Sequence, residues 1–107
     1  MGDRVQMVEG ILQVPDHPVI PFIEGDGIGR DIWPAAQHLF DEAITHCYED
    51  RRTVQRMEVL AGEKAFQPEG TWLPRETIEG FRNYRVGLKG PLSTPVAAAL
   101  RYLNVTL

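Results

Sequence analysis

One short stretch, "PVIPFIEGDGIG" from Pro18 to Gly29, constrains the fold more than any other part of the 107-residue sequence. An apolar run, Val19 to Ile23, is closed by Glu24 and three closely spaced glycines. A strand that turns through glycine into a helix predicts the first half of a unit in which parallel strands alternate with helices. The helix is indicated by apolar residues three and four apart: Ile32, Ala36, Leu39, Phe40, Ala43 and Cys47.

The rest of the chain continues this alternation. Alternating and periodic apolar residues predict a second strand in "VQRMEVLAG", a loop in "QPEGTWLP", a second helix opening at "PRETIEGF" and a third strand in "YRVGLKG". Proline directly after Thr94 predicts a last helix from there to Leu107. We therefore expect an α/β fold with parallel strands, in which residues 1–107 form a single, incomplete domain.

Two prolines refine this expectation. Pro21 lies inside the first predicted strand and argues against a fully paired central position for it. Pro34 is compatible with the first turn of the first helix, where a missing N–H costs nothing.

Composition excludes several classes of function. The net charge is -4 and no aromatic-interleaved stripe of Lys and Arg occurs, so we expect no nucleic-acid partner. No apolar run approaches membrane-spanning length, and the N-terminus lacks the apolar core of a signal peptide. The single cysteine, Cys47, cannot form an intrachain disulfide and is expected to be structural. These features indicate a cytoplasmic protein without a membrane partner.

The glycine-rich turn allows two interpretations. Its spacing is one residue short of the G-x-G-x-x-G dinucleotide fingerprint, so close packing of strand and helix is favoured over phosphate contact. Glu24 and Asp26 form a carboxylate pair in this turn. Two acids alone make a weak metal site, so we expect solvated loop carboxylates and assign no metal ligand.

The segment from Lys89 to Asn104 is more specific. Lys89 ends a predicted strand, where open α/β sheets place their ligands. Ser93 and Thr94 add two hydroxyls and a helix N-terminus, which suits an anion. Arg101 and Asn104 lie three apart on similar faces of the next helix. A small carboxylated ligand and a plain capped helix with surface charges explain these residues equally well.

The stretches "IPFIEGDGIGRDIWPA", "MEVLAGEKAF", "WLPRETIEGFRNYRVGLKGPLSTPV" and "LNVTL" together resemble the N-terminal part of bacterial-type NADP-dependent isocitrate dehydrogenases. These belong to the isocitrate/isopropylmalate dehydrogenase family. The resemblance runs from about Ile11 to Leu107 and implies a partial three-layer sheet of that family's type.

The resemblance implies a function that belongs to the full enzyme. That enzyme oxidises isocitrate, passes hydride to NADP and decarboxylates the product to 2-oxoglutarate with Mg or Mn. By the same resemblance Ser93 and Thr94 lie beside the cofactor, and Lys89, Thr94, Tyr102 and Asn104 lie at the substrate.

Two departures from the family pattern favour an alternative. Ala97-Ala98-Ala99 replaces a glycine-rich stretch, and Tyr102 stands where the family has a substrate-binding serine. The family's catalytic base, metal-binding aspartates and adenosine loop have no match in this sequence, so we assign no catalytic residue and expect the chain to be inactive alone. The alternatives are a catalytically dead binding or interaction module and a structural domain. With an unpaired sheet edge, either is expected to oligomerise or to pair with another chain.

Overall fold

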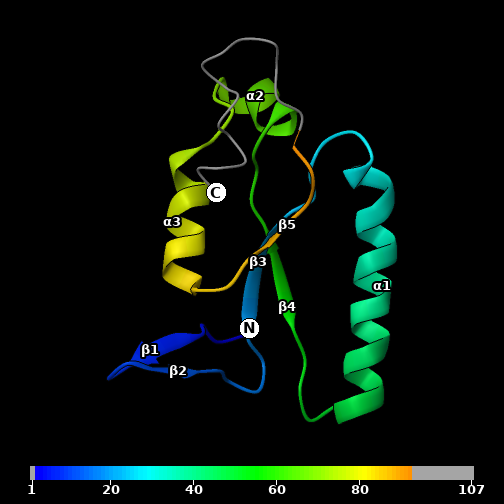
Figure 1. The fold of residues 1–107 in the computed structure, drawn as a ribbon, viewed down its shortest axis with the longest axis vertical. Coiled ribbons are helices and arrows are strands. Elements are labelled where there is room, and N and C mark those ends of the chain that lie inside the picture. Colours follow the sequence, from blue (N-terminus) through cyan, green and yellow to red (C-terminus); the bar gives the residue numbers. More distant parts are fainter. Residues whose placement is uncertain (1, 93–107) are drawn as a thin grey trace.

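The computed structural model describes residues 2–92 of the chain. Within residues 2–92 its elements follow the predicted alternation, with a hairpin placed before it, and the helix predicted from Thr94 to Leu107 lies outside the described residues (Figure 1). In chain order they are β1 (Gln6–Val8), β2 (Ile11–Gln13), β3 (Val19–Ile23), α1 (Gly29–Tyr48), β4 (Gln55–Glu58), α2 (Glu63–Glu69), α3 (Arg75–Tyr84) and β5 (Leu88–Lys89).

A parallel sheet with strand order β4-β3-β5 forms the middle layer. Val19 pairs with Gln55 at one end of the β3–β4 ladder, and Ile23 pairs with Lys89 on the other side of β3. Helices α1 and α3 lie on opposite sides of this sheet (Figure 1). The chain therefore has the α/β, three-layer arrangement that its sequence predicts, as a partial sheet.

β3 is the central strand but is not fully paired, in line with the expectation from Pro21: it pairs with β4 from Val19 to Phe22, whereas its pairing with β5 covers only Phe22 and Ile23. The carbonyls of Pro18 and Phe22 accept hydrogen bonds from Gln55 and Val59, so the even-numbered groups of β3 face β4. The missing N–H of Pro21 thus faces the β5 side, where pairing covers only Phe22 and Ile23. The proline is tolerated because β5 is too short to need its donor.

Two elements were not predicted from the sequence. A hairpin joins β1 and β2 through Glu9 and Gly10, which both have positive φ (51° and 78°), as a two-residue turn of type I′ requires. Helix α2 occupies Glu63–Glu69, so it includes the start of the stretch expected to be a loop. The third strand is also shorter than "YRVGLKG" suggests.

Helix α1 forms where the spacing of its apolar residues predicts, but a different face is buried. Only Gly29 and Trp33 are buried along it, and the Trp33 ring stacks on Phe22 of β3 with centroids 4.5 Å apart. Ile32 and Leu39 of the predicted apolar face are 49% and 67% exposed. The helix also begins at Gly29, which puts Pro34 in its second turn rather than its first.

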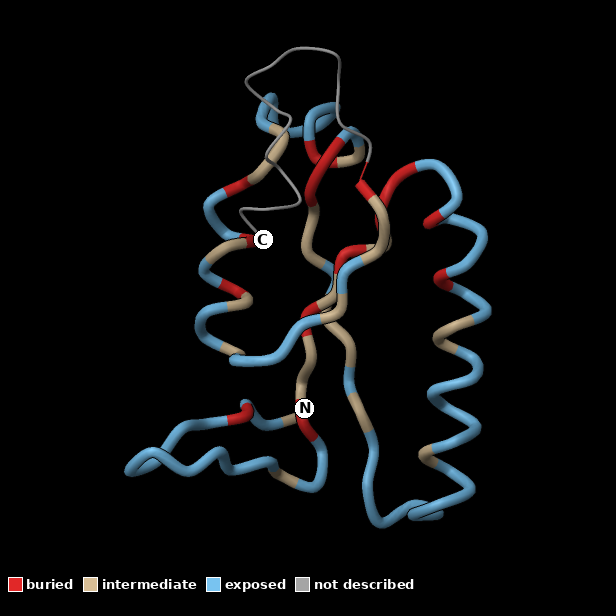
Figure 2. Tube along the Cα trace, viewed as in Figure 1, coloured by how far each residue is buried: buried red, intermediate tan, exposed pale blue. Residues whose placement is uncertain are grey.

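The core of the described chain lies near the carboxyl ends of the strands (Figure 2). Ile23, Ala61 and Leu92 form its buried centre. Partly buried side chains pack around them: Val59, Trp72, Leu73 and Phe81. Within residues 2–92, no helix is long and apolar enough to cross a membrane.

Candidate functional site

Three loops meet at the carboxyl edge of the sheet, where ligands of open α/β folds bind (Figure 1). The glycine-rich turn Glu24–Ile28 follows β3, the segment Val59–Gly62 follows β4, and Gly90–Leu92 follows β5. This edge is the candidate site, because Lys89 ends β5 there.

Glycines in two of these loops let the backbones touch. The N–H of Asp26 donates to the Pro91 carbonyl at 2.7 Å, and the N–H of Gly90 donates to the Ile23 carbonyl at 2.7 Å. A Cβ on Gly25, whose φ is +93°, would lie 2.4 Å from the Pro91 oxygen. A Cβ on Gly90 would lie 2.1 Å from the Glu24 carbonyl oxygen. Gly25 and Gly90 thus serve close packing of one loop against another. The strand–helix packing that the sequence favoured holds at Gly29, where a Cβ would lie 2.4 Å from the Glu24 carbonyl oxygen, but not at Gly27, which has open space around it.

Asp26 is not the solvated carboxylate that the sequence suggested. It is 3% exposed and accepts hydrogen bonds from the N–H groups of Glu63 (3.1 Å) and Lys64 (3.3 Å). These are the first residues of α2, and the N-cap residue of that helix, Gly62, provides no side-chain cap. A carboxylate that accepts free N–H groups at a helix N-terminus stabilises that end of the helix. Asp26 therefore caps α2 from a distant part of the sequence.

Lys64 of α2 forms ion pairs with two carboxylates, one at the end of β4 and one directly after β3. The Lys64 Nζ lies 2.5 Å from Glu58 Oε2 at the end of β4 and 3.3 Å from Glu24 Oε1 after β3. The hydrogen bond and charge of Glu58, followed by those of Glu24, raise the pKa of Lys64 above its usual value of 10.5, against an opposing effect of burial. No local pattern in the sequence predicts this cluster, because its members come from three separate segments.

Lys89 lies on the rim of the site. Its side chain is exposed, and its Nζ donates to the Gly90 carbonyl at 3.0 Å. The other predicted site residues, Ser93, Thr94, Tyr102 and Asn104, lie outside the described residues, as do Ala97–Ala99. The structure thus places Lys89 at the edge where the sequence predicted it, and the rest of the binding segment stays a prediction.

The described residues contain no cluster suited to a metal ion. Among residues 2–92, no group of three or more His, Cys, Asp or Glu side chains is arranged to hold an ion. The carboxylates of the site are already engaged, Asp26 with α2 and Glu24 with Lys64. A divalent metal therefore finds no ligand set in the described part of the chain.

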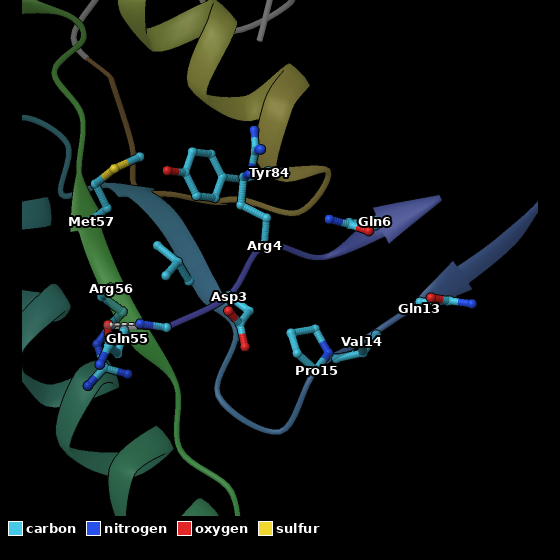
Figure 3. A pocket seen from close by; sticks show the side chains of 12 residues that line it. Asp3, Arg4, Gln6, Gln13, Val14, Pro15, Gln55, Arg56, Met57 and Tyr84 are labelled. Atoms are coloured by element: carbon cyan, nitrogen blue, oxygen red, sulfur yellow. Dashed lines mark hydrogen bonds between the residues drawn. The ribbon is translucent and has the colours of Figure 1, made fainter. Parts of the chain in front are cut away.

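A broad hollow of about 820 Å³ lies at the opposite, amino end of the strands (Figure 3). It separates the hairpin from Val19 and Gln55, and the Arg4 guanidinium lies 5.9 Å from the centre of the Tyr84 ring on its wall. Residues of the carboxyl edge do not line it. Because α/β sheets bind ligands beyond the carboxyl ends of their strands, this hollow is not the candidate site.

Known proteins share both the sequence and the fold. Residues 19–107 match the model of the isocitrate/isopropylmalate dehydrogenase family. The chain is 51% identical over its whole length to an isocitrate dehydrogenase [NADP] from Streptococcus salivarius, and 47% identical over 99% of its length to that of Coxiella burnetii.

It covers 27% and 25% of those proteins, so it spans about a quarter of their length. The crystal structure of isocitrate dehydrogenase from Methylococcus capsulatus matches with a TM-score of 0.69 and 40% identity, over 82% of this chain and 24% of that one. The resemblance seen in the sequence is therefore confirmed: the chain belongs to the isocitrate/isopropylmalate dehydrogenase family.

Proposed function

We propose that this chain carries part of the substrate-binding side of an NADP-dependent isocitrate dehydrogenase and acts on isocitrate together with residues that its own sequence does not contain. The observation that supports this most is the position of Lys89. It stands at the carboxyl edge of a parallel sheet and directly precedes the Gly90–Leu92 segment held against the glycine-rich turn. A cation at this edge suits a substrate with several carboxylates.

In this proposal four residues between Lys89 and Asn104 bind or orient the substrate and the cofactor. Lys89 donates to a substrate carboxylate, the hydroxyls of Ser93 and Thr94 lie at the nicotinamide and the substrate, and Asn104 hydrogen-bonds the substrate. The full enzyme would use NADP as the hydride acceptor and Mg or Mn as a Lewis acid, and this sequence supplies only the residues that would bind and orient the substrate beside them. No residue of this sequence is assigned as base or metal ligand. The chain by itself is therefore proposed to bind without turnover, in the cytoplasm.

A second candidate is a catalytically dead binding or interaction module. Tyr102 and Ala97–Ala99 favour it, because a phenol ring is far larger than a hydroxymethyl group and alanines bring side chains where the family has none. In this case the fold persists but the pocket for isocitrate is filled.

The test is calorimetric titration of isocitrate with Mg²⁺, and then of NADP, into the purified chain. We expect saturable isocitrate binding that weakens roughly tenfold to a hundredfold in Lys89→Ala and in Asn104→Ala, since each loses a hydrogen bond to a charged group. Asn83→Ala, at an exposed position of α3, is the matched control and keeps wild-type affinity. A dehydrogenase assay on the same samples should detect no NADPH.

Other outcomes separate the two candidates. No binding by the wild type, but binding by Tyr102→Ser, supports a filled pocket and the dead module. No binding by either protein contradicts a role in isocitrate binding. NADPH production by the chain alone contradicts the proposed absence of turnover.

A further inference from the structure

We propose that Asp26 is a positioning residue that sets the course of the backbone into the binding segment, by joining three loops at the carboxyl edge. The inference rests on the proposed function, in which residues Lys89 to Asn104 bind the ligand. We call the contact set of Asp26, Glu63, Lys64 and Pro91 the Asp26 junction.

The side chain and the backbone of Asp26 hold different segments. Its carboxylate accepts the N–H groups of Glu63 and Lys64, which begin α2. Its own N–H donates to the carbonyl of Pro91, one residue before the buried Leu92. One buried residue thus connects the loop after β4 to the loop after β5, and a shift of either is transmitted to the other.

The backbone is packed so closely around the Asp26 junction that two neighbouring positions accept only glycine. Gly62 has φ +74°, and a Cβ there would lie 2.2 Å from Asp26 Oδ2 and 3.1 Å from a Leu92 methyl carbon. A Cβ on Gly25 would lie 2.4 Å from the Pro91 carbonyl oxygen. A side chain at either glycine would therefore collide with the junction, and both glycines adopt conformations that residues with side chains rarely adopt.

The Gly90–Leu92 segment is also held by the hydrophobic core. Leu92 is 8% exposed and packs with Ile23 and Ala61. The Pro91 carbonyl is held by Asp26, and the Gly90 N–H is held by the Ile23 carbonyl. Three consecutive residues are therefore fixed by backbone bonds or burial directly before Ser93. A binding loop that starts from a fixed backbone loses less conformational entropy when it takes up a ligand.

The rival explanation is that Asp26 only caps α2. Capping would protect the amides of Glu63 and Lys64 and nothing else. A positioning role predicts more. The hydrogen bond from the Asp26 N–H to the Pro91 carbonyl should be stable only while the Asp26 carboxylate is hydrogen-bonded to α2. Asp26→Asn distinguishes the capping role from the positioning role, because it changes the side chain and leaves the backbone N–H of residue 26 intact.

The experiment is amide hydrogen exchange, followed residue by residue by NMR, on wild type, Asp26→Asn and the control Asp31→Asn in the first turn of α1. We expect Asp26→Asn to speed exchange at least tenfold at Glu63, at Lys64 and at the amide of residue 26 itself. The amide of Val59, which lies directly after β4 and donates to the Phe22 carbonyl of β3, should keep its rate. Asp31→Asn should change none of the four.

Two results would overturn the proposal. Faster exchange at Glu63 and Lys64 alone would reduce Asp26 to a helix cap. A uniform rise that includes Val59 would assign it to global stability. If Asp26→Asn does not fold, Glu63→Pro removes one donor at a helix position where proline is tolerated. It should speed exchange at Asp26 by a smaller factor, and an unchanged Asp26 amide would count against the junction.

Isocitrate titration then connects the junction to the site. If the wild type binds isocitrate with Mg²⁺, Asp26→Asn should weaken that affinity about tenfold, although Asp26 is buried against α2. Equal affinities, beside altered exchange, would overturn the positioning role. If the wild type binds no isocitrate, the proposed function fails, while the exchange rates still decide whether the junction exists.

Discussion

At the scale of single residues, the candidate site depends on glycines where two loops come too close for a side chain. Gly90 and Gly80 are both partly or fully buried glycines, yet they face different surroundings. A Cβ on Gly90 would lie 2.1 Å from the Glu24 carbonyl oxygen, whereas one on Gly80 would meet Val59 at an ordinary 3.6 Å. The sequence alone cannot distinguish these two positions, because the difference depends on a neighbour from another loop.

We expect Gly90→Ala to lower the free energy of unfolding by about 2–4 kcal/mol, because backbone on both sides must shift. Gly80→Ala, inside α3, should raise it by up to about 1 kcal/mol, since alanine is the better helix former. Urea unfolding followed by circular dichroism measures both. Equal effects of the two substitutions would contradict the close approach of the two loops.

At the scale of elements, the sequence predicts those that local pattern specifies. Three elements were predicted from local features: β3 from its apolar run, α1 from its periodicity and α3 from Pro74 before it. The rule that α/β sheets bind ligands at the carboxyl ends of their strands pointed to Lys89. Helix α2 was missed because Pro68 and Gly70 are typical of a loop and because its cap, Asp26, lies 37 residues before Glu63. Contacts between distant segments have no local signature.

Helix α2 is also held by Lys64, and this makes a prediction about pH. Lys64 lies in the first turn, where a cation is unfavourable for the helix dipole, but Glu58 and Glu24 compensate for it. Its pKa is raised mainly by the hydrogen bond to Glu58. The contribution of its ion pairs to stability is therefore complete below about pH 10.5, the usual lysine value, and is lost as pH rises through the higher folded pKa.

Lys64→Met should lower the free energy of unfolding by about 0.2–1 kcal/mol at neutral pH, the range for partly exposed pairs. The difference from wild type should shrink above pH 10.5. Lys64→Arg is the control, because arginine keeps its charge throughout this range and should retain its contribution at high pH. Urea unfolding at several pH values tests this, and a difference between Lys64→Met and wild type that does not change with pH would contradict it.

At the scale of the whole molecule, the described chain buries little and exposes much. Its buried apolar residues are few, namely Val5, Ile23, Trp33, Ala61, Ala65 and Leu92. Most of α1 and the whole hairpin are exposed (Figure 2). The apolar stripe along α1, which we define as the N-cap residue Ile28 together with Ile32 and Leu39, is 49–67% exposed, and nothing within residues 2–92 covers it. Such surfaces are typical of regions that pack against another polypeptide.

We therefore expect the purified chain to associate with itself as its concentration rises, since burying the stripe against a second copy removes apolar surface from water. Sedimentation velocity over a range of concentrations should show a rising average mass. Leu39→Gln together with Ile32→Gln should weaken the association, whereas Glu42→Gln, elsewhere on the exposed surface of α1, should not. A stable monomer at every concentration would contradict this expectation. It would mean that an apolar helix face of this size is tolerated in water without a partner, and that the exposed stripe is no guide to how the chain assembles.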